Sequence, residues 1–384
     1  MTNVGAREDA DDRLVRKLQQ LTAGSEEMFV MRPRHRVLTA IAAFWLGTVA
    51  TADAQQKLTI TIVTQPFSTQ PQFTKVDQPI LRDGLKAKSN GQIDVKLSAW
   101  PEMNLNGPEV LRLIRAGQVD IGAAPLSTVS GDVPFLDGID LAGLHPDIEQ
   151  ARKTALALVP LANKELAKFG SQIVAIYPFP AQVIWCRQPV SSLADLKGRK
   201  IRTFGASLND FVTAIGAQPV SIGFPEVYSA LERGVADCAV TGTGSGNAAK
   251  WYEVTTSIYN LSVGWAVAAY YVNTAWWKKL DQPTRDLISA TMKEVELAQW
   301  KLGAEATQDG LDCNAGKAEG CKIHTLVTEK AMKVVDATAE DKATLKKIVE
   351  TVVIPGWVKR CGARCGEIYN EVVAPITGLK LTAN

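Results

Sequence analysis

Alternating apolar and polar positions recur in the first part of the chain and predict short strands separated by helices. Residues 58–63 alternate and are rich in β-branched side chains, which predicts a strand. A helix is expected over 75–87, where Ser-Asn-Gly follows, and a second strand over 93–97. Residues 109–116 predict another helix, and a third strand begins at 119. This β-α-β-α-β order predicts an α/β domain with a parallel-type sheet.

The same pattern restarts later in the chain and predicts a second, similar unit. The expected strands are 173–177, 183–186, 200–202 and 236–240, and the expected helices are 192–196, 208–215 and 226–234. A helical pattern over 282–308 is long enough to connect or brace both units. Two such lobes with a cleft between them place a ligand at the carboxyl ends of the strands.

The segment before the first strand has the three parts of a secretory signal peptide. A basic stretch at 31–36 precedes an apolar stretch at 37–49, and Ala52-Asp53-Ala54 follows as a small-x-small cleavage site. We therefore expect cleavage near Ala54 and export to the periplasm. The alternative is a short membrane anchor, but about 13 residues at ~1.5 Å each cannot span a core of ~30 Å. Residues 1–30 fit an over-extended start, with Met28 or Met31 as the initiator.

Composition narrows the class of protein. Hydrophobic residues make up 46% and charged residues 21%, which is typical of a globular chain rather than a disordered one. Lys and Arg number 42 against 40 Asp and Glu, so no basic excess points to nucleic acid as a partner. Only three histidines occur, which leaves little room for His-based metal chemistry, and we expect neither a metal site nor a cofactor.

All six cysteines follow the predicted signal peptide. An even count in an exported chain favours disulfides over metal ligands. We expect pairs Cys313–Cys321 and Cys186–Cys238, which leaves Cys361 with Cys365. That last spacing lies near the limit of disulfide reach in a helix, so crossed pairings among the last four cysteines stay open.

Several segments together resemble one receptor family. Residues 193–202 read Leu-Ala-Asp-Leu-Lys-Gly-Arg-Lys-Ile-Arg, and 224–237 run from Phe-Pro-Glu-Val-Tyr to Gly-Val-Ala-Asp. Residues 113–122 and 271–273 add similar blocks. Their order and spacing resemble the solute receptors of tripartite ATP-independent periplasmic (TRAP) transporters, dicarboxylate-receptor type. The resemblance covers nearly all of 55–384 and implies an α/β, two-lobe periplasmic binding protein fold, with the ligand cleft between the lobes and a long helix bracing both.

The resemblance also implies a ligand site. In those receptors the arginine that closes the Lys-Gly-x-Lys-x-Arg block grips the ligand carboxylate, and here it is Arg202, whose planar fork suits a carboxylate. We expect it to be solvated in the unliganded cleft; the alternative is a surface ion pair on a strand edge. The aromatic residue that packs against the ligand in the family matches Phe224 here. The alternative is that Phe224 is an ordinary core residue. Thr241 stands where the family often has Asn, and the Gly-rich segment after it offers hydroxyl and N–H donors or is a flexible loop.

One position departs from the family. Where many members carry a second arginine, this chain has Gln182, which favours a monocarboxylate or a keto or hydroxy acid over a dicarboxylate or a ligand like sialic acid. Four weaker candidates sit at predicted strand ends: Gln65, Trp100, Glu102 and Ser127. Trp100 would supply an apolar wall; its alternative is packing within a lobe.

The resulting expectation is a solute-binding protein, not an enzyme, that captures a small organic acid and delivers it to TRAP permease membrane subunits. The expected parts are a leader at 1–54, lobe I at 55–178, lobe II at 179–265, a return to lobe I with the connecting helix at 266–308, and a C-terminal part on lobe II at 309–384. Two rivals stay open: an exported two-lobe hydrolase or lyase, for which neither His145 nor His324 lies in a motif, and a receptor that feeds a sensor kinase.

Overall fold

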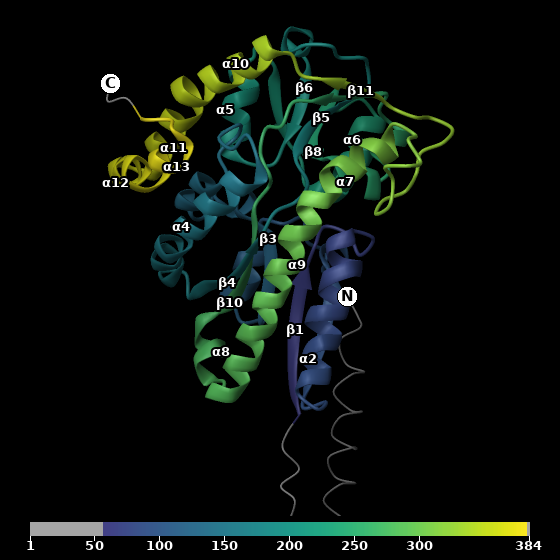
Figure 1. Cartoon of the computed structure of the whole chain (residues 1–384). Helices are drawn as coiled ribbons and strands as arrows, with labels where there is room; N and C mark the ends of the chain where they lie inside the picture. The colour runs from purple at the N-terminus through teal and green to yellow at the C-terminus, as the bar shows by residue number, and fades with distance from the viewer. Residues whose placement is uncertain (1–56, 382–384) are drawn as a thin grey trace, which may run out of the picture. The chain divides into compact units, whose positions relative to one another are not determined.

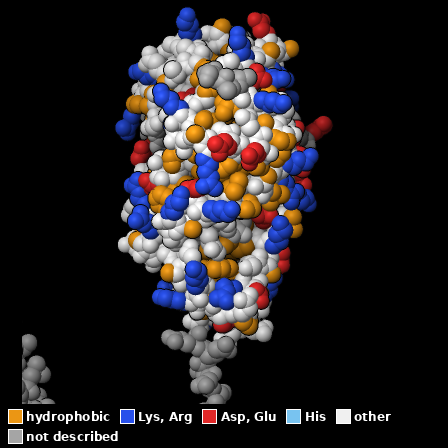
Figure 2. Space-filling view, turned by 90° about the vertical axis from the view of Figure 1, so that its left-hand side faces the viewer, with side chains coloured by type: hydrophobic (Ala, Val, Ile, Leu, Met, Phe, Trp, Pro, Cys, Tyr) orange, Lys and Arg blue, Asp and Glu red, His pale blue; other side chains and the backbone are white. Residues whose placement is uncertain are grey.

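The computed structural model describes residues 57–381. The predicted signal peptide, its cleavage near Ala54 and the alternative start sites lie outside the described residues. Within 57–381, no helix has both the length and the apolar character that a bilayer crossing requires. On the face shown in Figure 2, Lys and Arg side chains are spread along its length among acidic and hydrophobic ones.

Two mixed sheets organise the described chain. Sheet A has the strand order β2-β1-β3-β10-β4, with β1 (Leu58–Thr64), β2 (Ile93–Ala99), β3 (Ile121–Pro125), β4 (Ser171–Tyr177) and β10 (Ala268–Asn273). Sheet B has the order β11-β9-β5-β8-β6-β7, with β5 (Gln182–Cys186), β6 (Lys200–Thr203), β7 (Gln218–Ser221), β8 (Cys238–Gly242), β9 (Ser257–Asn260) and β11 (Lys333–Asp336). The predicted α/β fold with two units is confirmed (Figure 1).

The sheets are not purely parallel, which corrects one expectation. Strands β1, β2 and β3 run parallel, as do β6, β7 and β8, but β10 and β5 run antiparallel to their neighbours. Both of these strands arrive from the other sheet. A strand that arrives in this way enters at the edge where the parallel strands end, so it must run in the opposite direction.

Three segments join the two sheets. Residues 178–181 link β4 to β5, and 261–267 link β9 to β10. The two links run side by side, because Phe179 N donates to Trp265 O at 2.8 Å and Gln182 N donates to Gly264 O at 2.8 Å. The third segment is α9 (Gln282–Asn314), a helix of 33 residues that packs on β4 and on α7 (Thr243–Ala248). It begins at a cap formed by Asp281 and Pro283, and it is the predicted bracing helix, six residues longer than expected.

Other helices cover the sheets. Around sheet A lie a π-helical turn (Phe73–Arg82) that leads into α2 (Asp83–Lys88), α3 (Val110–Arg115), α4 (Ile148–Ala167) and α8 (Thr274–Lys279), and around sheet B lie α5 (Ala206–Ala214) and α6 (Val227–Glu232). The C-terminal group consists of α10 (Ala339–Ile348), α11 (Ile354–Cys361), α12 (Ala363–Ile368) and α13 (Ala374–Thr377). This group packs on α5 and also on α4, so it contacts helices next to both sheets.

The three expected disulfides are all formed, and crossed pairings do not occur. Cys186 and Cys238 face one another across the antiparallel pair β5–β8, so the ladder register itself brings the two sulfurs together. Cys313–Cys321 closes a short loop at the end of α9, and Cys361–Cys365 joins α11 to α12. These bonds agree with the predicted export to an oxidising compartment.

Candidate functional site

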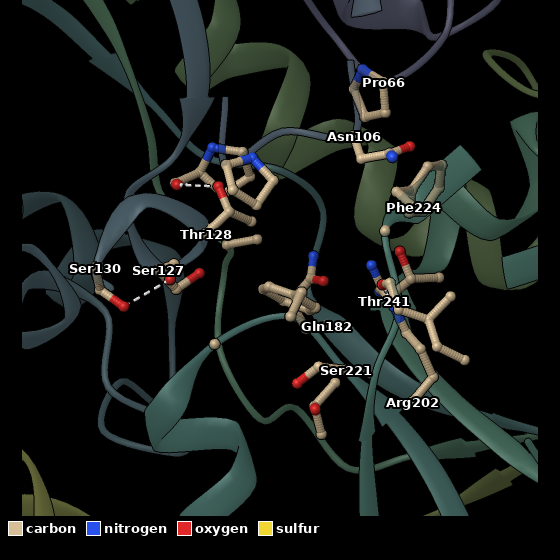
Figure 3. Close-up of a pocket in the computed structure, with 18 of the residues that line it drawn as sticks. Pro66, Asn106, Ser127, Thr128, Ser130, Gln182, Arg202, Ser221, Phe224 and Thr241 are labelled. Carbon is tan, nitrogen blue, oxygen red and sulfur yellow. Dashed lines mark hydrogen bonds between the residues drawn. The ribbon is translucent and has the colours of Figure 1, made fainter. Parts of the chain in front are cut away.

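A cavity of about 390 Å³ lies between elements of the two sheets, within the size range of small-molecule sites. From the side of sheet A it is lined by Pro66, Trp100, Asn106, Pro108, Pro125, Ser127, Thr128, Ser130 and Gly131. From sheet B and the linking segments it is lined by Phe179, Gln182, Arg202–Ala206, Asn209, Ser221–Phe224, Thr241, Ser245 and Ala266. Figure 3 shows Ser127 and Ser130 on one side of the cavity, Thr241 and Arg202 on the other, and Gln182 between them.

Arg202 is held rigidly on β6. Its Nε donates to Ile222 O at 2.9 Å, and its Nη1 donates to Val240 O at 2.9 Å. Nη1 carries a second hydrogen, and Nη2 makes no hydrogen bond to any residue of 57–381. The end of the guanidinium therefore keeps a pair of donors in the geometry that binds a carboxylate bidentately.

The expectation that Arg202 would be solvated in the unliganded cleft is wrong. The residue is only 2% exposed, and its guanidinium packs 5.0 Å from the ring of Phe204 and 5.7 Å from that of Phe224. Burial lowers the pKa of Arg202 to about 9, and no acidic side chain within 57–381 pairs with it. A buried cation without a counter-ion is costly, so an anionic ligand would stabilise this site.

The structure brings most of the sequence-predicted residues to this cavity. Gln182, Arg202, Phe224 and Thr241 all line it, as do the weaker candidates Trp100 and Ser127.

Gln65 and Glu102 are not among the lining residues. The amide of Gln65 instead donates to Asp77 and to the Tyr177 hydroxyl behind the wall, at 2.9 and 3.1 Å, and it is the next residue, Pro66, that lines the cavity. The Glu102 carboxylate accepts the backbone N–H of Ala99 at 3.2 Å.

Trp100 and Phe224 both line the cavity and also pack in the hydrophobic core, so each has the two roles that the sequence left open. Trp100 is buried and its Nε1 donates to Ala123 O at 3.0 Å, which fixes the ring as part of the sheet A core while one surface lines the cavity. Phe224 stacks on Trp251 with ring centroids 5.3 Å apart. Both rings thus present apolar surfaces that are held from behind.

Further polar side chains of the cavity were not singled out from the sequence, although hydroxyl donors were expected in the Gly-rich segment after Thr241. Asn209 lines it from α5 and accepts the Thr203 hydroxyl at 2.6 Å. Ser245 lies in the Gly-rich segment, which is a buried helix, α7, rather than a flexible loop. The Gly-rich composition of this segment marks it as a candidate part of the site, but the sequence does not distinguish Ser245 from the residues next to it.

One buried carboxylate ties elements of the two sheets together beside the cavity. Asp137, in the segment between β3 and α4, accepts the backbone N–H of Ser207 at 3.1 Å and its hydroxyl at 3.0 Å, at the start of α5. Arg360 lies 3.6 Å from the same carboxylate and pairs with Asp210 at 2.7 Å. Burial raises the pKa of Asp137 to about 6, with Ser207 and Arg360 opposing the rise.

Neither His145 nor His324 lines the cavity. Residues 57–381 contain no group of three or more His, Cys, Asp or Glu side chains arranged to hold a metal ion. The arrangement of the cavity is suited to holding an anion in place.

Comparison with known proteins identifies solute-binding proteins as relatives of this chain. The family model described as "Bacterial extracellular solute-binding protein, family 7" matches residues 64–353. The 2,3-diketo-L-gulonate-binding periplasmic protein of Escherichia coli is 27% identical over 253 residues, 65% of this chain and 76% of its own. The sialic acid-binding periplasmic protein of Vibrio cholerae is 23% identical over 294 residues, 74% and 87% of the two chains.

Solved structures share the fold. An extracytoplasmic solute receptor of Bordetella pertussis that binds pyroglutamic acid has a TM-score of 0.72 at 23% identity, covering 82% of this chain and 99% of its own. A TRAP periplasmic solute-binding protein of Desulfovibrio salexigens with bound orotic acid has a TM-score of 0.72 at 21% identity, covering 83% and 100%. As the resemblance to TRAP receptors predicted, the chain belongs to family 7 of the bacterial extracellular solute-binding proteins.

Proposed function

We propose that this protein captures a small organic acid in the cavity at Arg202 and delivers it to the membrane subunits of a TRAP permease. The observation that carries the proposal is the buried guanidinium of Arg202, which keeps a free pair of donors and has no acidic partner within 57–381. A carboxylate supplies both the charge and the two acceptors that this group lacks. The ligands named for the similar proteins above are likewise acids.

The preferred ligand in this proposal carries one carboxylate and an uncharged remainder. Arg202 is the only charged side chain among the described residues that line the cavity. Gln182, at the position where many family members have a second arginine, is neutral, and its Nε2 already donates to Pro180 O at 2.7 Å. A second carboxylate would therefore be buried without a counter-ion, which makes the binding free energy less favourable by at least ~2 kcal/mol.

Closure around the ligand is part of the same proposal. The linking segments 178–181 and 261–267 and the middle of α9 are the only covalent connections between sheets A and B up to residue 314 of the described chain, so rotation of the lobes would take place there. The division into lobe I at 55–178, lobe II at 179–265, a return at 266–308 and a C-terminal part at 309–384 remains our proposal. We also propose export to the periplasm with cleavage near Ala54.

A thermal-shift screen of organic acids tests the proposal. A ligand that binds only the folded state stabilises it by about 2.7 kcal/mol at a hundred times its Kd. We expect monocarboxylates with hydroxyl, keto or lactam groups to raise the melting temperature more than dicarboxylates of the same size. If neutral amides of these acids raised it equally, the carboxylate would not be the group recognised and the proposal would fail.

A further inference from the structure

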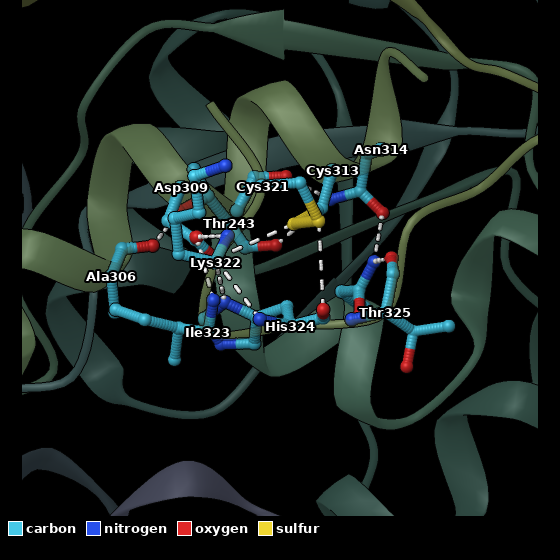
Figure 4. The surroundings of a disulfide bond; sticks show 12 residues. Thr243, Ala306, Asp309, Cys313, Asn314, Cys321, Lys322, Ile323, His324 and Thr325 are labelled. Atoms are coloured by element: carbon cyan, nitrogen blue, oxygen red, sulfur yellow. Dashed lines mark hydrogen bonds and ion pairs between the residues drawn. A yellow bond between two sulfur atoms is a disulfide. The ribbon is translucent and has the colours of Figure 1, made fainter. Parts of the chain in front are cut away.

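A short loop is fastened to the end of α9 at two points. We call residues 313–325 the stapled loop. The first fastening is the disulfide Cys313–Cys321, which closes the loop onto the last turn of α9 (Figure 4). A covalent link over eight residues leaves the returning chain little freedom, so the segment after Cys321 is directed back along the helix.

The second fastening is Asp309, one turn earlier on α9. Its carboxylate accepts the backbone N–H groups of Lys322, Ile323 and His324, the last two at 2.8 and 3.1 Å. The same carboxylate lies 2.6 Å from Nδ1 of His324, so both the backbone and the imidazole are fixed. His324 is almost fully buried, with 2% of its side chain exposed.

The fastened loop lies directly against α7. The His324 ring packs on Gly244 so closely that a Cβ there would overlap its imidazole. Asn247 makes a two-way contact with the Thr325 backbone, accepting its N–H at 3.0 Å and donating to its carbonyl at 2.9 Å. Asn314 donates to Thr243 O at 3.0 Å. The loop and the end of α9 thus hold α7 along one side.

A different side of α7 forms part of the cavity wall. Gly244 and Asn247 are three residues apart and share a helical face, whereas Ser245 is turned by about 100° from Gly244. Ser245 lines the cavity and is 4% exposed, and its hydroxyl has no hydrogen-bond partner among the described residues. A buried hydroxyl without a partner is unfavourable unless a ligand satisfies it.

We propose that the stapled loop holds α7 in the position that places Ser245 against a neutral polar group of the bound acid. Asp309, His324 and Asn247 are then positioning residues, because each acts on the ligand only through α7. The inference rests on the proposed function and deepens it: the acid carries a hydroxyl, keto or lactam group toward Ser245. A displacement of about 1 Å would break such a hydrogen bond, since its length is narrowly limited.

Hydrogen exchange of the unliganded protein gives the first test. The double variant Cys313→Ala/Cys321→Ala is compared with Cys361→Ala/Cys365→Ala, which removes the disulfide between α11 and α12. We expect amides at 241–248 to exchange about tenfold faster in the first variant and at the wild-type rate in the second. Unchanged exchange at 241–248 in the first variant would overturn the proposal. Because no ligand is present, this result is independent of whether any acid binds.

Calorimetric titration with L-pyroglutamate gives the second test. We expect His324→Ala to weaken binding about tenfold in the wild-type background and less than about twofold in a Ser245→Ala background. Equal losses in both backgrounds would mean that His324 serves folding alone, and the proposal would fail. If His324→Ala does not fold, Asn247→Ala takes its place in the cycle. If L-pyroglutamate does not bind, the exchange experiment alone decides whether the stapled loop holds α7. The absence of binding would then count against the choice of acid or against the proposed function.

Discussion

The two walls of the cavity are built in different ways. The sheet B wall carries the charge of Arg202 and the neutral polar groups of Thr241 and Ser245, supported by backbone hydrogen bonds and by α7. The sheet A wall presents the apolar surfaces of Pro66 and Trp100, with serine and threonine hydroxyls beside them. This difference suggests that the sheet B wall recognises the acid and that the sheet A wall chiefly excludes water from it.

The largest expected effect is on the sheet B wall. Arg202→Ala removes one partner of a buried charge pair, which typically costs about 2–5 kcal/mol, or roughly 30- to several-thousand-fold in affinity. Arg202→Lys should restore only part of this, because it returns the charge without the bidentate geometry. Calorimetric titration with the strongest acid of the screen measures both. A loss below about threefold for Arg202→Ala would show that the anchor lies elsewhere.

The second effect concerns the contact between Asp137 and Ser207, which joins elements of the two sheets beside the cavity. Burial raises the pKa of Asp137 to about 6 from an ordinary value of 3.8, so the folded state binds this proton more tightly than the unfolded state. Stability should therefore fall as the pH rises from about 4 to about 6, by up to ~3 kcal/mol for this group. Denaturant unfolding at pH 4, 5, 6 and 7 measures the slope, and Asp137→Asn should lack this part of it.

Asp77 serves as the control for that prediction, because burial raises its pKa to about 6 as well. It lies in the core network of sheet A with Gln65 and Tyr270, away from the Asp137 contact. Asp77→Asn should remove a separate part of the slope. If the dependence of stability on pH were unchanged in both variants, neither carboxyl group would have the raised pKa that burial implies.

The charge of the ligand tests whether Arg202 is the single cationic group of the cavity that recognises it. A dicarboxylate such as glutarate should bind about 30-fold more weakly than L-pyroglutamate, ~2 kcal/mol, because its second charge finds no cation in the cavity. Gln182→Arg should narrow this gap. Equal affinity of the wild type for both acids would contradict a single charged anchor.

The smallest effect is expected on the sheet A wall. Trp100→Phe keeps an aromatic surface and loses the hydrogen bond from Nε1 to Ala123 O, which is worth about 1 kcal/mol of stability. Affinity for the acid should change less than about threefold. A loss as large as that of Arg202→Ala would show that the sheet A wall also recognises the ligand.

Local patterns were sufficient to predict strands β1 to β6 and β8, several connecting helices and the long helix α9, because burial on one face leaves a period in the sequence. They did not predict β7, β9, β10 or β11, and they placed the strand at 173–177, β4, in the second unit, whereas it belongs to sheet A. They assigned no helix to α4 or to the C-terminal group. The run of strands was expected to stay parallel because the pattern does not reveal that β5 and β10 cross between sheets.

The resemblance to TRAP receptors identified Arg202, Gln182 and Thr241, but not the state in which Arg202 is held. Its burial depends on carbonyls of Ile222 and Val240, which lie about 20 and 38 residues away along the chain. The Asp137–Ser207 contact and the support of α7 by His324 are likewise long-range. Contacts of this kind leave no periodic trace, so only the structure reveals them.

A crystal structure of the protein with the strongest acid of the screen tests the central claim most directly. We predict the carboxylate oxygens about 2.7–2.9 Å from Nη1 and Nη2 of Arg202, the range of charge-assisted hydrogen bonds. The rest of the acid should lie between the Phe224 and Trp100 sides of the cavity. A carboxylate bound against the hydroxyls of the sheet A wall, with the guanidinium of Arg202 still unpaired, would contradict the account.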